Sequence, residues 1–338
     1  MNNLKILIIG RKYGGPLGRV TSYKKFLESK NHVVSVYHYP GEGYSSKLWW
    51  YYTRGLAFLS GHERRHMKYS ADRLEKVIRQ GRYDAVICIE HPISYVLTRD
   101  LGCVKIFSYE APEVDELYYS NKCSPERIAA YRDLEIEIMQ KSDFVVFPWK
   151  TTEDHVRKNI LNGNNFVTLK YGCYPKEEKV SYTSPTAVVF IGTAGYYWVN
   201  RDLISILTKK SPFPIDLYGR HKPPRKFHLN YKGFADSLDI LRNYQFGLNT
   251  VCKGPIKFHS SKILTYLSYG LPSLSPDWLQ FSHELKGVLP FNENNFVDLV
   301  HCYSDQDKWE KLSAAAFEQA HELDWNLTLQ PLEKMISK

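Results

Sequence analysis

The sequence predicts an α/β protein made of two doubly wound domains, each with a parallel sheet between layers of helices. Its 338 residues correspond to about two domains at roughly 150 residues each. Short apolar runs alternate with amphipathic stretches in the first half, and the same alternation begins again near residue 187. Hydrophobic residues make up 43% of the chain and charged residues 24%, which excludes a disordered or low-complexity protein.

Residues 1–171 are expected to form the first domain. Short apolar runs predict strands at residues 4–9, 32–37, 85–89, 104–108 and 144–147. Apolar residues at helical spacing predict helices at residues 23–30, 68–80 and 125–141. Because strand–helix–strand units place parallel strands side by side, we expect one sheet with helices on both faces.

The second domain is expected to span residues 186–321. Its predicted strands are residues 187–191, 215–218, 246–250 and 272–274, and its predicted helices are residues 202–209, 262–269 and 308–321. The glycine and prolines between residues 171 and 185 predict a linker. In open α/β sheets ligands bind beyond the carboxyl ends of the strands, so the turns there are the places to search.

Cysteine spacing and hydropathy argue against a zinc protein, a disulfide-rich protein and a membrane-spanning protein. None of the six cysteines has a C-x-x-C partner, so neither a zinc site nor a disulfide scaffold is expected. The N-terminal apolar run is short and enters a glycine-rich turn, which predicts a strand and not a signal peptide. No apolar run is long enough to cross a bilayer. We therefore expect a cytoplasmic location.

Basic residues gather near the start of the chain. The net charge is +9, and residues 1–82 hold 16 Lys/Arg against 5 Asp/Glu. Within residues 44–82 the cations are interleaved with Trp and Tyr, a mixture that suits an anionic membrane surface. The same mixture would suit nucleic-acid phosphates, or a solvated helix with one buried aromatic face. We expect a peripheral membrane surface here, with nucleic acid the less favoured partner.

Two glycine- or serine-containing turns could hold an anion. Gly14, Gly15, Gly18 and Arg19 follow the first predicted strand and are expected to form an acceptor-side loop, although they fit neither G-x-G-x-x-G nor the P-loop pattern. The stronger signal is Ser260-Ser261-Lys262, directly before a predicted helix. Serines at a helix start, unpaired backbone N–H groups and a lysine together favour a bound anion.

The segment from Lys262 to Pro272 has the pattern K-x-x-x-Y-L-x-x-G-L-P, which resembles the nucleotide-sugar site of GT-B glycosyltransferases. The resemblance implies two Rossmann-like domains that face each other across a cleft, with a C-terminal helix over residues 322–338 that crosses back to the first. It also implies that Lys262 binds the donor diphosphate. The remaining donor-binding residues that it suggests are Ser260, Ser261, Gly192, Thr193, Arg220, Phe234 and Thr265.

The chain departs from the pattern of the largest retaining family of this fold. That family has glutamates at the positions of Lys257 and Thr265, one of which holds the ribose hydroxyls. We therefore do not assign the chain to that retaining family. The overall arrangement also resembles bacterial polysaccharide transferases.

The acceptor-side chemistry is expected at strand ends of the first domain. An inverting transfer to a hydroxyl needs a general base. Four titratable residues follow two of the predicted strands, namely Glu90, His91, Glu110 and Glu113. We expect Glu110 or Glu113 as the base, beside Tyr109 as a ring that could stack on a sugar. If the enzyme retains configuration, Glu90 or His91 would stabilise charge on the donor sugar.

The resemblance thus predicts a metal-independent glycosyltransferase that moves a sugar from a nucleotide-sugar donor to a glycan or lipid-linked glycan in bacterial surface polysaccharide synthesis. No cofactor is expected, and Asp305-Gln-Asp307 is interpreted as a helix cap and not a metal motif. Two alternatives stay open. One is a DNA-modifying glucosyltransferase, and the other is a sugar-nucleotide epimerase or binding protein, suggested by His221, His228 and His259.

Overall fold

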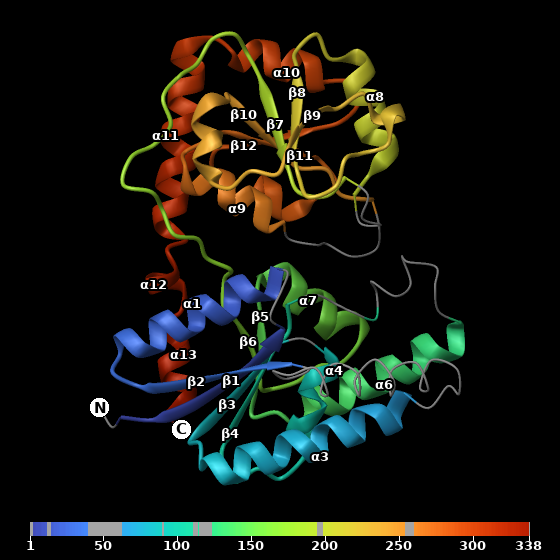
Figure 1. Cartoon of the computed structure of the whole chain (residues 1–338), viewed down its shortest axis with the longest axis vertical. Helices are drawn as coiled ribbons and strands as arrows, with labels where there is room; N and C mark the ends of the chain where they lie inside the picture. The colour runs from blue at the N-terminus through green and yellow to red at the C-terminus, as the bar shows by residue number, and fades with distance from the viewer. Residues whose placement is uncertain are drawn as a thin grey trace. The chain divides into compact units, whose positions relative to one another are not determined.

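The computed structural model describes residues 3–11, 15–39, 63–89, 91–110, 114, 124–194, 199–253 and 260–337. The chain forms two compact units. The first unit comprises Met1–Lys170 together with Thr328–Lys338, and the second comprises Tyr171–Leu327. Each unit contains one six-stranded sheet, and the two units are drawn in Figure 1.

The first unit is built on a parallel sheet with the strand order β2-β1-β3-β4-β5-β6. Its strands are β1 (Lys5–Arg11), β2 (Val33–Tyr39), β3 (Ala85–Ile89), β4 (Val104–Ser108), β5 (Phe144–Phe147) and β6 (Phe166–Thr168). The central strand β3 is buried along its whole length, as expected for a parallel strand covered on both faces. The sequence analysis predicted every strand of this sheet except the three-residue β6.

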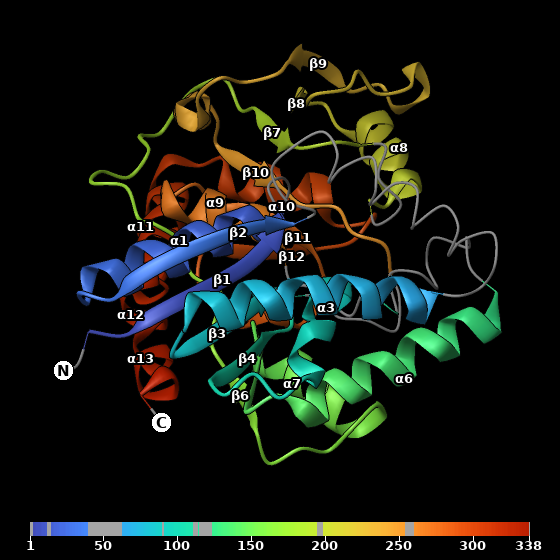
Figure 2. The same ribbon diagram turned by 60° about the horizontal axis from the view of Figure 1, so that its bottom comes forward.

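Helices cover both faces of this sheet (Figures 1 and 2). They are α1 (Gly15–Ser29), α3 (Glu63–Gly81), α4 (His91–Ser94), the 3₁₀ helix η1 (Tyr95–Thr98), α6 (Pro125–Lys141), α7 (Lys150–Asn159) and α13 (Gln330–Ile336). Met67, Ala71, Leu74 and Ile78 of α3 recur every three or four residues and are buried in one core cluster with α6. Helix α6 begins where Ser124 accepts a hydrogen bond from the Arg127 N–H.

Helix α1 is longer at its N-terminus than the sequence analysis predicted. It begins at Gly15, so Gly15 and Gly18 lie within the helix and not in a loop. Glycine weakens a helix by about 1 kcal/mol relative to alanine, so Gly15 and Gly18 do not themselves favour a helix here. Packing overrides that preference here, because Val20, Tyr23 and Leu27 are buried on the inner face of the helix. Gly14 lies outside the described residues.

The second unit has a parallel sheet with the strand order β12-β11-β10-β7-β8-β9. Its strands are β7 (Val188–Ile191), β8 (Ile215–Tyr218), β9 (Asn230–Gly233), β10 (Phe246–Leu248), β11 (Ser273–Pro276) and β12 (Val288–Phe291). The chain builds outward from β7 to β9 and then returns to place β10 on the other side of β7. The boundary between β7 and β10 is therefore the switch point of the sheet, where doubly wound folds bind ligands.

The helices of the second unit pack around this sheet (Figure 1). They are α8 (Arg201–Lys210), α9 (Ser261–Ser268), α10 (Phe296–Tyr303), α11 (Gln306–Glu322) and α12 (Trp325–Thr328), with the 3₁₀ helices η2 (Arg225–Phe227), η3 (Leu238–Asn243) and η4 (Gln280–His283). Asp305 caps α11, because its side chain accepts a hydrogen bond from the Lys308 N–H at 3.1 Å. The Asp305-Gln-Asp307 segment is thus a helix start, as the sequence analysis interpreted it.

Residues 171–185 pack as part of the second unit, although their glycine and prolines had suggested a linker. The Lys176 N–H donates to the Ser268 carbonyl at 2.9 Å, and the Val180 N–H donates to the Tyr269 carbonyl at 2.8 Å. Val180 is fully buried in the core of that unit. The segment therefore satisfies carbonyl groups at the end of α9.

Candidate functional site

Candidate ligand-binding residues follow consecutive strands along one edge of the second sheet. In the order of the strands, Phe234 follows β9, Arg220 follows β8, Gly192 follows β7 and Asn249 follows β10. Neighbouring strands lie about 4.8 Å apart, so the span from β9 to β10 is about 14 Å. The Phe234 side chain is 64% exposed, which is unusual for a ring of this size.

The turns after β7 and β8 approach each other so closely that only glycine fits. The Gly192 N–H donates to the Tyr218 carbonyl, and the Gly219 N–H donates to the Gly233 carbonyl, both at 2.8 Å. A Cβ atom on Gly219 would lie 2.1 Å from the Gly192 oxygen, and Gly192 itself has a φ of +121°. The close approach of bare backbone leaves the carboxyl edge without side chains at these two positions.

Gly219→Ala is expected to separate these two turns. The added methyl group meets a backbone oxygen and cannot be accommodated by rotation of a side chain, so the turns must shift. We expect a loss of about 2 kcal/mol or more in the free energy of unfolding, and weaker nucleotide binding. Chemical denaturation measures the free energy of unfolding, and calorimetry measures the affinity for a nucleotide. Gly81→Ala is the control, because Gly81, like Gly219, has no positive φ, and its added methyl group would meet only the half-buried ring of Tyr83, a side chain that can move aside. Equal stability losses in the two variants would contradict the steric account.

Lys262 lies in the first turn of α9 and reaches the same edge. A Cβ atom on Gly192 would lie 2.8 Å from Lys262 Cε, so the lysine chain passes directly over that glycine. Its Nζ lies 5.3 Å from the centre of the Phe190 ring. Burial lowers the pKa of Lys262 to about 8. Across the ranges that the structure describes, no carboxylate pairs with this cation, so the site has an unbalanced positive charge.

The start of α9 adds hydrogen-bond donors beside Lys262. Ser260 at the N-cap is 7% exposed, and its side chain makes no capping hydrogen bond. Ser261 begins the helix and is exposed, whereas the Thr265 hydroxyl donates to the Ser261 carbonyl at 3.1 Å. The first N–H groups of a helix carry partial positive charge and lack partners within the helix. With Lys262 they form a site for an anion such as a phosphate.

Tyr266 fixes α9 at the switch point and was not predicted as a site residue. Its hydroxyl accepts a hydrogen bond from the Ile191 N–H and donates to the Leu248 carbonyl, both at 3.1 Å. It thereby joins the ends of β7 and β10. The ring fills the space of an absent side chain at Gly247, where a Cβ atom would lie 2.4 Å away. The only sequence signal was the tyrosine four residues after Lys262, which places both on one face of the helix.

Arg19 and Glu110 form a buried ion pair in the first unit. Arg19 is fully buried, and its Nη1 lies 2.9 Å from Glu110 Oε1. The other terminal nitrogen of Arg19 donates to the Leu169 carbonyl at 3.0 Å. The Ser108 hydroxyl donates to the same Oε1 atom at 2.8 Å and lies 3.1 Å from the Tyr23 hydroxyl. The cluster joins α1 to the carboxyl ends of β4 and β6.

Glu110 has one oxygen that the cluster does not use. Its contacts all go to Oε1, and within the described part of the chain Oε2 has no partner. The side chain is 10% exposed. Burial raises the pKa of Glu110, and the Arg19 guanidinium partly offsets that rise. A carboxylate with a raised pKa and one unused oxygen has the properties of a general base.

Tyr109 cannot stack on a sugar, and this expectation was wrong. The side chain is 1% exposed and lies in the core cluster with Phe107 and Phe147. Its hydroxyl donates to Glu135 at 2.9 Å. Side chains alternate along the chain here, so Tyr109 faces the layer of α6 whereas Ser108 and Glu110 face α1. Glu90, Glu113, His259 and the side chain of His91 lie outside the described residues.

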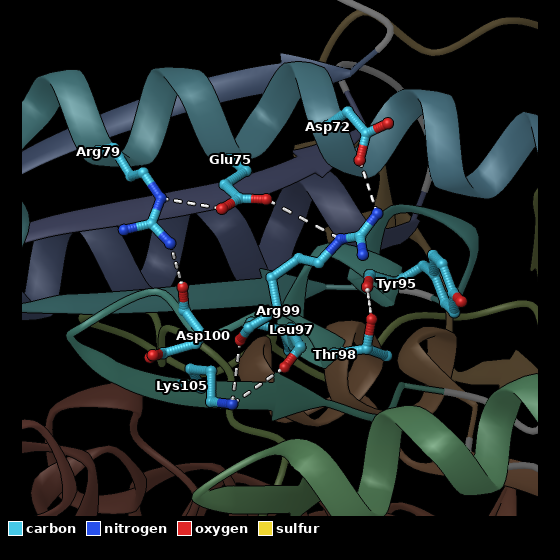
Figure 3. Close-up of polar contacts among 9 residues, drawn as sticks. All are labelled: Asp72, Glu75, Arg79, Tyr95, Leu97, Thr98, Arg99, Asp100 and Lys105. Atoms are coloured by element: carbon cyan, nitrogen blue, oxygen red, sulfur yellow. Dashed lines mark hydrogen bonds and ion pairs between the residues drawn. The ribbon is translucent and has the colours of Figure 1, made fainter.

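Some of the cations on and beside α3 are paired with acidic side chains (Figure 3). Arg79 pairs with Glu75 at 2.8 Å and donates to the Asp100 carbonyl at 2.6 Å. Arg99 pairs with Asp72 at 2.6 Å, so this network ties α3 to the segment after η1. Lys68 and Lys76 are exposed on the same helix. Residues 44–62 lie outside the described residues, and no described helix could span a membrane.

Comparison with known proteins identifies the fold. No family model and no curated protein sequence matches the chain. Among solved structures, it is similar to the sucrose-phosphate synthase of Thermosynechococcus elongatus, with a TM-score of 0.75, 12% identity, and coverage of 99% of this chain and 98% of that one. A glycosyltransferase from Rickettsia africae gives a TM-score of 0.69, 12% identity, and coverage of 100% and 98%.

A third similar structure is the catalytic domain of starch synthase IV from Arabidopsis thaliana, solved with ADP and acarbose. Its TM-score is 0.69 at 12% identity, and the match covers 99% of each chain. These similarities cover nearly the whole of each compared chain. The chain therefore has the GT-B fold, which confirms the fold that the sequence analysis predicted.

Proposed function

We propose that the protein is a GT-B glycosyltransferase that binds a nucleotide sugar along the carboxyl edge of the second sheet. The observation that carries this proposal is Lys262, a half-buried cation at the start of α9 and at the switch point of the sheet, for which the described residues provide no counterion. A donor diphosphate would supply the missing negative charge. The starch synthase of the same fold binds ADP, which supports a nucleotide ligand here.

The order of residues along the edge matches the order of groups in a nucleotide sugar. The exposed Phe234 offers a flat apolar surface to a base at the β9 end. Arg220, Gly192, Thr193 and the start of α9 would hold the diphosphate in the middle, with Ser260 and Ser261 as further donors. The sugar would then lie toward β10. Thr265 is turned back onto its own helix, so we propose only a contact through its methyl group.

The leaving diphosphate is proposed to be stabilised without a metal ion. Lys262, Arg220 and the α9 N-terminus together provide positive charge at the position where negative charge develops. Among the described residues no three metal-ligating side chains gather. The proposal requires that transfer continues at an unchanged rate in the presence of a chelator. Added Mg²⁺ or Mn²⁺ should not increase that rate. Complete loss of activity on chelation would contradict it.

In the first unit we propose Glu110 as the general base toward an acceptor hydroxyl. The unused Oε2 atom is the one that would take the proton, while Arg19 and Ser108 hold the carboxylate in place. Arg19 is thus proposed as a positioning residue and not as part of an acceptor-side loop. Glu113, Glu90 and His91 are retained as candidates, because they follow the strands β4 and β3 in the sequence.

The experiment that tests this function is a screen for hydrolysis or transfer with UDP-, ADP- and GDP-linked sugars. A glycosyltransferase releases the nucleoside diphosphate slowly in water and faster with its acceptor. Interconversion of the sugar without release would indicate an epimerase, and modification of bases in added DNA would indicate a DNA-modifying enzyme. Release from none of the donors would contradict the proposal.

Nucleotide binding should weaken as the pH rises through about 8. The anion requires protonated Lys262, whose pKa of about 8 means that protonation is complete below this pH and lost above it. We expect about a tenfold weaker affinity for a nucleoside diphosphate at pH 9 than at pH 7, measured by calorimetry. Lys262→Met should remove this pH dependence. A slope that persists in this variant would assign the titration to another group.

The acceptor is proposed to be a glycan or lipid-linked glycan of a bacterial surface polysaccharide, reached at an anionic membrane surface through residues 44–82. Exposed Lys68 and Lys76 support this role. Sedimentation with anionic vesicles should therefore exceed that with neutral vesicles, and high salt should reduce it. Lys68→Glu/Lys76→Glu should weaken the binding, whereas the same charge change at Lys209 and Lys311 in the second unit should not. Equal sedimentation with both vesicle types would remove the membrane proposal.

A further inference from the structure

A buried amide lies at the carboxyl end of β10. Asn249 is fully buried, and its N–H donates to the Leu274 carbonyl at 2.8 Å, which continues the pairing with β11 beyond the end of the strand. Its side-chain Nδ2 donates to Ser275 Oγ at 3.1 Å, and Ser282 donates to the same Ser275 oxygen at 2.9 Å. These three side chains form a fixed polar cluster beneath the edge that carries Lys262.

One end of this amide has no partner. Within the described part of the chain, Asn249 Oδ1 makes no hydrogen bond, and neither does the hydroxyl of fully buried Thr250. Rotating the amide by half a turn would exchange its oxygen and nitrogen but still leave one polar end unpaired. A buried amide group without a partner costs about 1–3 kcal/mol, which a protein tolerates where a ligand completes the bond.

The position of Asn249 indicates what that ligand group is. Along the strand, Asn249 shares the face of Gly247, the position against which Tyr266 of α9 packs. Asn249 therefore lies on the α9 side of the sheet. In the strand order β9, β8, β7, β10, it comes after Phe234 and Gly192. Lys262 can compensate the charge of a phosphate, whereas the neutral and fully buried amide of Asn249 cannot. The amide is suited to a neutral hydroxyl.

We infer that Asn249 is a specificity-determining residue that bonds a hydroxyl of the donor sugar. The inference rests on the proposed function, because it requires that the diphosphate occupies the Lys262 site. A hydroxyl can donate to Oδ1 or accept from Nδ2, so the amide reads the presence and direction of one ring hydroxyl. Sites that bond a hydroxyl in this way reject analogues that lack it.

The experiment compares bare nucleoside diphosphates with their sugar conjugates by calorimetry. The probes are UDP with UDP-glucose, ADP with ADP-glucose, and GDP with GDP-mannose. For the pair that the native protein binds, Asn249→Leu should lower affinity for the sugar conjugate about tenfold and leave affinity for the bare diphosphate within about twofold. In Asn249→Ser the shorter side chain cannot reach the sugar hydroxyl, so the sugar conjugate should again lose affinity while the bare diphosphate does not. This second variant keeps a polar side chain and shows whether the result for Asn249→Leu comes from a folding defect.

Ser282→Ala is the matched control, because it removes a buried hydroxyl from the same cluster but leaves the unpaired end of Asn249 in place. Both affinities should stay within about twofold of the native values. Equal losses for diphosphate and conjugate in the Asn249 variants, or no loss for either, would overturn the inference and leave the proposed function intact. If the native protein binds none of the three diphosphates, the proposed function itself fails.

Discussion

Replacing Lys262 with methionine should weaken nucleotide binding and at the same time stabilise the free protein. Methionine has a similar length and keeps the apolar contacts over Gly192 and Phe190, but it removes the charge. The diphosphate loses one charge-assisted contact worth about 1.5–3 kcal/mol, so affinity should fall about tenfold to a hundredfold. Calorimetric titration with a nucleoside diphosphate measures this loss.

The gain in stability follows from the desolvated charge of Lys262, which is half-buried. The pKa of about 8 lies below the ordinary 10.5, so the folded protein holds the protonated lysine at a cost. Removing the charge should raise the free energy of unfolding at pH 7 by roughly 1–3 kcal/mol. Between pH 8 and 10.5 the unfolded chain binds more protons, so native stability should rise with pH there while the variant shows no such rise.

The two measurements on Lys262→Met distinguish a functional lysine from a structural one. If Lys262 supports the fold, its replacement should lower the free energy of unfolding. If it is retained for a ligand, its replacement should lower the affinity for that ligand and raise the free energy of unfolding. Lys286→Met is a useful comparison. Lys286 is paired with Glu318 and Glu322 on the surface, and its replacement should change neither nucleotide affinity nor stability by much. Unchanged affinity in Lys262→Met would remove this residue from the site.

Glu110→Gln should abolish most of the transfer activity. A general base typically contributes a factor of about 10²–10⁴, and glutamine cannot accept the proton. The same substitution leaves the buried Arg19 without a countercharge, so we also expect a loss of about 3 kcal/mol in the free energy of unfolding. The assay must therefore separate lost chemistry from lost structure.

A double variant provides that separation. Arg19→Met/Glu110→Gln removes both charges, so most of the lost stability should return. If Glu110 is the base, transfer stays low in the double variant, while affinity for the donor in the second unit is unchanged in every variant. Recovery of transfer together with stability would show that Glu110 acts only through the fold. Glu153→Gln is the control for a buried acid with basic partners but no proposed chemical role.

The strands that the sequence analysis missed have identifiable physical reasons. Strand β6 is only three residues long, and β9 is a polar edge strand whose residues are exposed or half-buried. Strand β12 lies at the opposite edge and contains Pro290, which counts against a strand except at an edge. Strands such as β3 and β7 were predictable because they are continuous apolar runs that are buried along most or all of their length.

Some residues of the candidate site could be predicted from the sequence and others could not. Lys262 was predictable because the serines, the lysine and the helix pattern are contiguous in the chain. The approach of Gly219 to Gly192 depends on how β7 and β8 are aligned, which no local pattern records. The ion pair of Arg19 with Glu110 joins residues far apart in sequence. The unpaired amide of Asn249 is detectable only after every neighbouring hydrogen bond is known.

A crystal structure with a bound nucleotide sugar tests the central proposal most directly. We expect the diphosphate at the start of α9, with an oxygen about 3 Å from Lys262 Nζ. The base should lie toward Phe234 and the sugar toward Asn249, in the order of the strands β9, β8, β7 and β10. A diphosphate bound away from Lys262, or a nucleotide lying in the opposite direction along this edge, would contradict the account.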